Sequence, residues 1–128
     1  MAYIEKYGIK FHPDFWFLLP GFNAITLFGH VFCKMTMGEL RNYLITAAGK
    51  RLANHEGIHI AQVKSIKTGY VGFYALYLMY WFRNLFVCPS KAYRNIPFEK
   101  EAYANQYNYN YLIDHPTSCW RDYKDWRK

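Results

Sequence analysis

The sequence has few cysteines and few acidic residues, and we expect it to carry no targeting segment. Its three cysteines, Cys33, Cys88 and Cys119, are far apart and show no CxxC spacing, which argues against a disulfide scaffold and favours reduced thiols. The first residues lack a basic stretch followed by an apolar one, so we expect no signal peptide. The uncharged run 68–82 is shorter than the roughly 20 residues that cross a bilayer. We therefore expect an intracellular protein, either cytoplasmic or attached peripherally to a membrane.

The composition is that of one folded, basic domain. The chain has 128 residues, of which 52% are hydrophobic and 21% aromatic, so it holds enough apolar surface to exclude a disordered protein. Sixteen basic residues against nine acidic ones give a net charge of +7, which favours acidic partners such as an anionic membrane surface. A nucleic-acid partner is not expected, because no known RNA- or DNA-binding module is visible.

The pattern of apolar residues and of helix-terminating residues predicts a mixed α+β chain. Residues 1–24 indicate an irregular arm or a short strand, and 24–34 a strand or bent hairpin in which Gly29 marks a turn or a bulge. A capping-box spacing at Thr36 and Glu39 opens a first helix, which Gly49 is expected to interrupt. Three further helices are predicted over 50–67, 71–86 and 97–113.

The helix predicted over 50–67 carries the sequence His55-Glu56-Gly57-Ile58-His59, which is H-E-x-x-H. Residues i and i+4 share one face of a helix, so the two imidazoles can converge on one zinc ion. Glu56 is rotated to one side, where it can act as general base on a zinc-bound water. Both histidines fall on the apolar arc of the helix, where burial is costly unless they are paired or bound to metal. The alternative is a pair of core histidines hydrogen-bonded to tyrosines.

A catalytic zinc needs a third protein ligand, and two downstream carboxylates can supply it. Glu99 and Glu101 lie two residues apart on the predicted fourth helix and point in different directions, so only one should reach the metal. Glu101 is preferred, because Asn105 follows it by one turn and could hydrogen-bond a metal-bound histidine. Glu99 remains the alternative, although an acid in the first turn of a helix is also stabilised by the helix dipole.

These motifs resemble the gluzincin branch of the zinc metallopeptidases. The segments NHEGIHIAQ (54–62) and YRNIPFEKEAYANQ (93–106), together with AITLFGHVF (24–32), are most similar to small single-domain bacterial proteins that share N-H-E-x-I-H-x-x-Q and F-E-K-E-A-Y. In gluzincins the ligand glutamate opens an E-x-x-x-D pattern, whereas here Glu101 is followed by Asn105. This substitution keeps a hydrogen-bonding group but loses a charge.

The resemblance implies a minimal zincin-like domain, in which a short twisted sheet or hairpin lies on the active-site helix. In the family an edge strand pairs with extended substrate above the metal, a role that would fall within 25–32, with His30 facing the cleft. Larger gluzincins supply a tyrosine or histidine to stabilise the oxyanion, and Tyr103 and Tyr107 are the first candidates here. Gln62, one turn beyond His59, is expected to be a structural hydrogen-bonding partner.

The sequence therefore predicts a zinc metallopeptidase that binds one Zn²⁺ through His55, His59 and Glu101. Glu56 would take the proton of the attacking water and pass it to the leaving amine of a peptide or protein substrate. The alternative function is a zinc-binding or membrane-surface module of the same fold without turnover. It is suggested by the small size of the chain and by the aromatic segment 70–82 beside basic residues.

Overall fold

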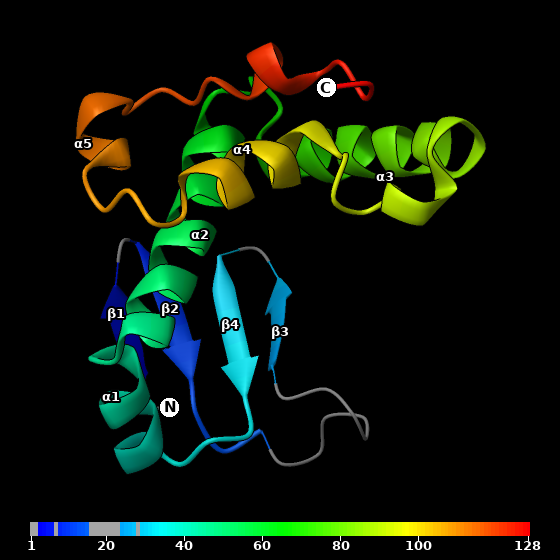
Figure 1. Ribbon diagram of the computed structural model, residues 1–128. Coiled ribbons are helices and arrows are strands. Elements are labelled where there is room, and N and C mark those ends of the chain that lie inside the picture. The colour runs from blue at the N-terminus through cyan, green and yellow to red at the C-terminus, as the bar shows by residue number, and fades with distance from the viewer. Residues whose placement is uncertain (1–2, 7, 16–23, 28) are drawn as a thin grey trace. The chain divides into compact units, whose positions relative to one another are not determined.

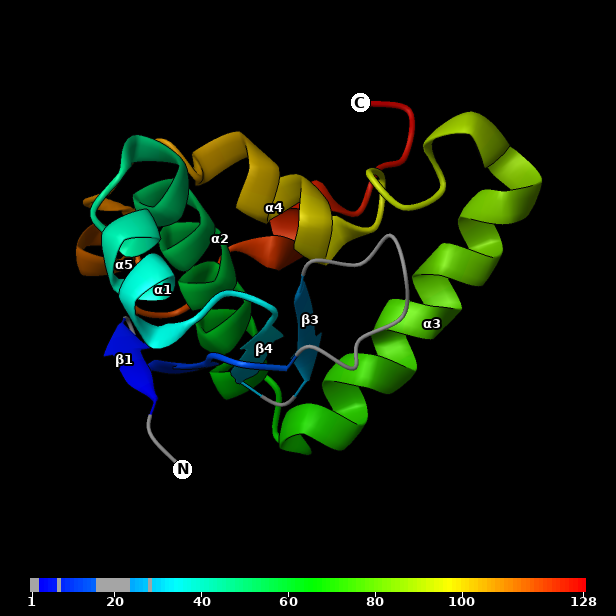
Figure 2. The same ribbon diagram turned by 90° about the horizontal axis from the view of Figure 1, so that it is seen from below.

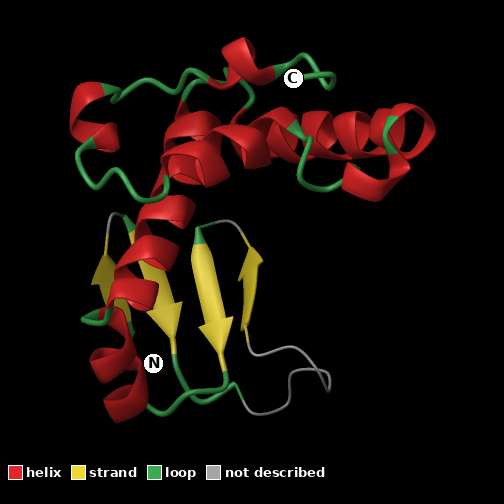
Figure 3. Ribbon diagram, in the orientation of Figure 1, coloured by secondary structure: helices red, strands yellow, loops and turns green. Residues whose placement is uncertain are grey.

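The computed structural model describes residues 3–6, 8–15, 24–27 and 29–128 (Figure 1). It combines strands and helices, as the sequence predicts, and Figure 3 shows the strands gathered in one sheet. The chain divides into two compact units, Met1–Gly57 and Ile58–Lys128. All three cysteines are free thiols, in agreement with their spacing in the sequence.

The first unit contains a four-stranded sheet with the strand order β1-β2-β4-β3. β2 and β4 pair in parallel at the centre, and β1 and β3 pair antiparallel with them at the two edges. The strands are β1 (Ile4–Lys6), β2 (Ile9–His12), β3 (Ala24–Leu27) and β4 (His30–Cys33). The turn predicted at Gly29 is present, with φ of 80°, a backbone region that favours glycine.

One sequence expectation about this sheet needs correction, and another is confirmed. The segment 1–24 was expected to be an irregular arm or a short strand, but it holds β1 and β2, while 16–23 lie outside the described residues. The bent hairpin expected over 24–34 is present as β3 and β4, and the edge strand within it is β3. β4, which carries His30, has a hydrogen-bonded neighbour on each side. Its backbone therefore has no open edge that could add a substrate strand.

Alternation along the central strands gives the sheet a buried face and a partly exposed face. Ile9 and Phe11 of β2 and Val31 and Cys33 of β4 are at most 2% exposed, whereas the residues between them are partly buried. α1 (Met37–Leu44) and the first turns of α2 (Ala47–Lys64) cover one face of the sheet (Figures 1 and 2).

A capping box begins α1, and a glycine at the start of α2 allows these two helices to approach closely. The predicted capping box at Thr36 and Glu39 is present. The break falls at Ile45 and Thr46, however, and Gly49, the expected interruption, lies inside α2. The Thr46 hydroxyl accepts a hydrogen bond from Gly49 N at 3.1 Å, and a Cβ at Gly49 would overlap the backbone carbonyl of Tyr43. Glycine is therefore needed because the two helices approach closely there, and it does not end either of them.

The second unit is helical and is built around α3 (Gly69–Val87) and α4 (Pro97–Asn105). The helix predicted over 97–113 is interrupted, because α4 ends at Asn105 and α5 (Tyr111–Asp114) follows. The side chain of Asn108 accepts a hydrogen bond from Asn110 N at 3.1 Å, and such local bonds compete with the helix. Two 3₁₀ turns, η1 (Pro89–Lys91) and η2 (Trp120–Tyr123), complete the unit.

The core of this unit is aromatic and places α4 against α2 and α3. Phe98 of α4 is fully buried, with its ring centroid 4.5 Å from that of Phe73 and 4.7 Å from that of Trp120. Ala102, one turn further along α4, packs with Ile58 and Tyr111. This packing fixes the face of α4 that meets the last turns of α2. Within the described part of the chain, no helix has both the length and the apolar character needed to cross a membrane.

Candidate metal centre

α2 carries both histidines of the H-E-x-x-H sequence on one face. The helix runs without interruption from Ala47 to Lys64, so the spacing of His55 and His59 depends only on the helix itself. The His55 side chain is buried and that of His59 is partly buried. The sequence prediction that the two imidazoles turn away from solvent is therefore confirmed.

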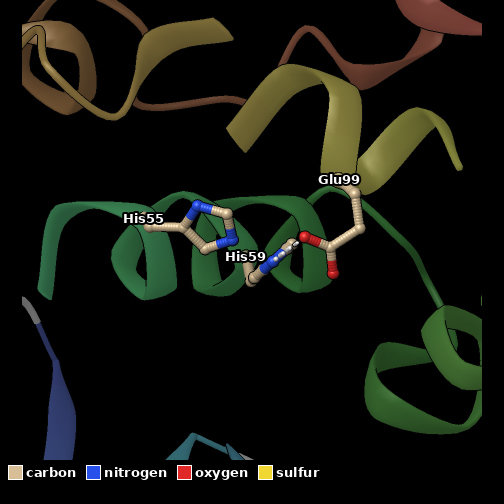
Figure 4. A group of neighbouring side chains, drawn as sticks. All are labelled: His55, His59 and Glu99. Atoms are coloured by element: carbon tan, nitrogen blue, oxygen red, sulfur yellow. Dashed lines mark ion pairs between the residues drawn. The ribbon is translucent and has the colours of Figure 1, made fainter. Parts of the chain in front are cut away.

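The carboxylate that joins the two histidines belongs to Glu99. Pro97 begins α4, and Glu99 lies in its first turn with its side chain directed toward His59 (Figure 4). His59 Nε2 lies 3.3 Å from Glu99 Oε1. One ligand atom from each of His55, His59 and Glu99 lies within 4.8 Å of the others. Among the described residues, these three form the group that could hold a metal ion, and we call it the His–Glu group.

The spacing of this group suits a small divalent cation. Nitrogen and oxygen ligands at about 2.1 Å from a tetrahedral zinc are about 3.4 Å apart, which is close to the His59–Glu99 distance of 3.3 Å. The ligand atom of His55 lies within 4.8 Å of the other two. Two imidazoles and one carboxylate also form a ligand set that zinc accepts in catalytic sites.

The structure corrects the choice between the two carboxylates. Glu101, the predicted third ligand, is fully buried but lies outside the His–Glu group. Two residues on a helix are separated by about 200°, so the turn of α4 that directs Glu99 to His59 directs Glu101 elsewhere. Its carboxylate lies in a separate set of hydrogen bonds.

Four donors surround the Glu101 carboxylate. Oε1 accepts hydrogen bonds from Gln62 Nε2 at 2.7 Å and from the Ser118 hydroxyl. Oε2 accepts from the Tyr111 hydroxyl at 2.7 Å and from Cys119 N at 2.8 Å. Burial, followed by the hydrogen bond to Glu101 and its charge, raises the pKa of Tyr111. A buried carboxylate is stable when its oxygens are satisfied in this way, so Glu101 anchors the segment after α5 to α4.

Gln62 connects Glu101 to the His–Glu group. Its amide nitrogen donates to Glu101 Oε1 at 2.7 Å and to the Phe98 carbonyl at 2.8 Å. Both amide hydrogens are then used, which leaves Gln62 Oε1 to face His59 Nδ1 at 2.8 Å. Because Oε1 can only accept, His59 Nδ1 must carry a hydrogen. In the neutral imidazole the lone pair is then on Nε2, the nitrogen beside Glu99. Gln62 therefore has the structural hydrogen-bonding role that the sequence predicts.

Tyrosines fix the other side of Glu99. The Tyr77 hydroxyl donates to Glu99 Oε2 at 2.7 Å, which leaves Oε1 directed to His59. Burial, then the Glu99 charge and the hydrogen bond to it, raises the pKa of Tyr77. Burial and the same charge also raise the pKa of Tyr93. Both phenols therefore stay protonated, and the Tyr77 phenol donates to the carboxylate.

Glu56 follows His55 on α2 and is partly buried. A step of one residue rotates it by about 100° from His55, so it lies beside the face that carries the two histidines. Glu56 is not part of the His–Glu group, and its role as general base stays a prediction.

The remaining predicted site residues lie elsewhere. Tyr103 stacks under the Arg94 guanidinium at 3.8 Å, and Tyr107 is 67% exposed. His30 lies in β4 and shares a 2.8 Å hydrogen bond with His12. The Asn105 amide nitrogen donates to the Glu101 carbonyl at 2.8 Å. The residue that holds His59 is therefore Gln62, and none of these four belongs to the His–Glu group.

Sequence reasoning missed Tyr77, although a signal for it exists. Phe73, Tyr77, Tyr80 and Asn84 follow one another at steps of four, three and four residues on α3, which marks its inner face. A tyrosine on that stripe must bring its hydroxyl into the core, where it needs a partner. The sequence contains 13 tyrosines, and of the tyrosines of α3 the stripe selects Tyr77 and Tyr80.

Comparisons of the chain with protein-family models, with curated proteins and with solved structures return no match. The resemblance to gluzincins therefore rests on the motif residues alone and stays a prediction.

Proposed function

We propose that this protein is a zinc-dependent peptidase of minimal gluzincin type, with zinc bound by His55, His59 and Glu99. The observation that carries the proposal is the 3.3 Å approach of Glu99 Oε1 to His59 Nε2, on a helix that bears H-E-x-x-H. The His–Glu group has three members among the described residues. Three protein ligands are typical of catalytic zinc sites, which keep one coordination position for water or substrate.

The residues around the group support this role by preparing its ligands. Gln62 keeps His59 in the tautomer whose Nε2 lone pair can bind metal, and Tyr77 directs Glu99 Oε1 towards the same point. Fixed ligands of this kind bind metal more tightly, because less side-chain freedom is lost on binding. When bound, a zinc ion acidifies water and polarises a substrate carbonyl.

Glu56 is the residue that moves the proton in this proposal. Its carboxylate takes a proton from the attacking water while the oxygen of that water bonds to the carbonyl carbon. Glu56 then gives the proton to the amine as the peptide C–N bond breaks. Tyr93 is 46% exposed and lies near Glu99, so it is placed to donate a hydrogen bond to the carbonyl oxygen as negative charge develops there.

The second candidate function is a metal-binding module without turnover. His55 is 7% exposed and Glu99 is 4% exposed, which favours a closed site over an open cleft. In that case metal binding would stabilise the fold by joining α2 to α4.

An assay on Glu56→Gln separates these functions. The zinc-loaded full chain is incubated with fluorescein-labelled casein and with a fluorogenic peptide library, and zinc content is measured in parallel. We expect chelator-sensitive cleavage by the wild type, and a rate at least about a hundredfold lower for Glu56→Gln, which should still bind one zinc. Equal rates would refute the assigned base. If the zinc-loaded wild type cleaves neither probe, the peptidase proposal fails and the metal-binding module is favoured.

A further inference from the structure

α3 has two apolar faces, and only one of them is covered. Its inner face carries Phe73, Tyr80 and Asn84, which are buried in the core of the second unit. The opposite face carries large apolar side chains that are each at least 39% exposed, namely Val71, Leu78, Met79, Phe82, Leu85 and Phe86. We call these six residues the outer face of α3.

The outer face forms a continuous stripe. Its members recur at the three- and four-residue steps that place side chains on one side of a helix, and they span about 23 Å at 1.5 Å per residue. Phe86 is 75% exposed and Phe82 is 60% exposed, and their rings lie against each other with centroids 5.3 Å apart. Contiguous exposed apolar side chains of this kind mark contact surfaces.

The charged residues of α3 and of the segments that flank it in the sequence are all basic. The segment 57–98 contains no aspartate or glutamate. Exposed basic residues precede α3 at Lys64 and Lys67, and others follow it at Lys91 and Arg94. The apolar outer face is thus bounded at both ends by positive charge.

We propose that the outer face of α3 docks on an anionic lipid bilayer. Apolar and aromatic side chains between basic ends are the pattern by which helices lie in a membrane interface, and each basic residue adds attraction to anionic headgroups. Trp81, which is 40% exposed beside the stripe, is a residue type enriched at that depth. Because the inner face of α3 is buried in protein, only the outer side chains enter the lipid. The inference does not rest on the proposed peptidase function.

A second copy of the chain is the competing occupant, and charge disfavours it. Pairing two outer faces would bring the basic residues that flank α3 in one copy near those of the other. Like charges brought together in this way repel. An anionic surface turns the same residues into attractive contacts.

The test is co-sedimentation of the full chain with vesicles of phosphatidylcholine, alone or mixed with phosphatidylglycerol. We expect binding to the anionic vesicles, and at least fivefold weaker binding in high salt, where charges are screened within a few ångströms. The double variant Phe82→Gln/Phe86→Gln should bind at least about tenfold more weakly. Ile113→Gln is the matched control, because Ile113 is 77% exposed on α5 of the same unit, and it should bind as the wild type does.

Several results would overturn the proposal. The wild type could fail to bind anionic vesicles, or the double variant could bind as tightly as Ile113→Gln. Sedimentation equilibrium without lipid tests the competing occupant: a wild-type dimer that Phe82→Gln/Phe86→Gln converts to a monomer would assign the outer face to a second copy. Circular dichroism shows whether each variant is folded, and Leu78→Gln/Met79→Gln on the same face replaces the first pair if that pair unfolds.

Discussion

Gln62 Oε1 accepts a hydrogen bond from His59 Nδ1 at 2.8 Å, and this bond determines which nitrogen of the imidazole can bind metal. The amide nitrogen and oxygen of Gln62 cannot exchange places, because the nitrogen already donates hydrogen bonds to the Phe98 carbonyl and to Glu101. The orientation of one buried glutamine thus links the Glu101 carboxylate to the His–Glu group.

Gln62→Leu should weaken zinc binding by about 10- to 100-fold, the usual cost of removing a residue that holds a ligand histidine. It should also lower the free energy of unfolding by about 1–3 kcal/mol, because the Phe98 carbonyl and Glu101 each lose a buried donor. Competition with a chromophoric chelator measures the affinity, and urea unfolding measures the stability. Gln106→Leu, just after α4, serves as control. Wild-type zinc affinity in Gln62→Leu would show that His59 does not depend on this bond.

Glu101→Gln should destabilise the fold by about 2–4 kcal/mol. The four donors that converge on the Glu101 carboxylate would then meet a neutral amide, and one of its two polar atoms is itself a donor. Urea unfolding is the measurement. Asp114→Asn, an exposed acid in the same unit, should change the stability by less than about 0.5 kcal/mol. The assigned anchoring role is wrong if both variants unfold at the same urea concentration.

The sequence predicted the two histidines of the site but not its carboxylate. Helical spacing fixes His55 and His59 relative to each other, whatever surrounds them. The choice between Glu99 and Glu101 depends on how α4 is rotated about its axis, and the burial of Phe98 and Ala102 sets that rotation. Such packing between distant segments leaves no local signal. The sequence preference for Glu101 used Asn105, which instead bonds along α4.

Helices and their ends were predicted correctly where the signal is local, and wrongly where a contact between segments decides. The capping box at Thr36 and the apolar run of α3 are local signals, and both elements are present. Gly49 was expected to break a helix because glycine has low helix propensity. It lies inside α2 instead, and the close approach of the Tyr43 carbonyl requires a residue without a side chain there.

Two glycine-to-alanine substitutions should therefore act in opposite directions. Gly49→Ala should lower the free energy of unfolding by at least about 2 kcal/mol, because the new methyl group would overlap backbone atoms of Tyr43 and Leu44. Gly38→Ala in α1 meets no atom within 4 Å and should raise it by about 0.5–1 kcal/mol through helix propensity. Urea unfolding of both variants measures the difference. Equal effects would refute the close approach of the two helices.

Acid should destabilise the protein partly through His12. Burial, then the nearby His30 and Lys10, lowers the pKa of His12 below 6.5, and no described residue accepts a hydrogen bond from its buried Nδ1. As the pH falls, His12 is therefore protonated in the unfolded chain before it is protonated in the folded protein. The contribution of His12 to stability is complete above pH 6.5 and is lost as the pH falls through the lower pKa of the folded state.

Urea unfolding of the zinc-free protein above and below that pH tests this prediction. His12→Gln should show a smaller loss of stability on acidification than the wild type does. An unchanged slope in the variant would mean that other groups cause the acid sensitivity.

Zinc affinity of Glu99→Gln and Glu101→Gln, measured side by side by chelator competition, is the most direct test of the His–Glu group. The two substitutions are chemically identical and lie two residues apart. We predict one zinc per wild-type chain, an affinity reduced at least about a hundredfold in Glu99→Gln, and a reduction of at most about tenfold in folded Glu101→Gln. Wild-type affinity in Glu99→Gln, or a wild type that binds no zinc, would contradict the account.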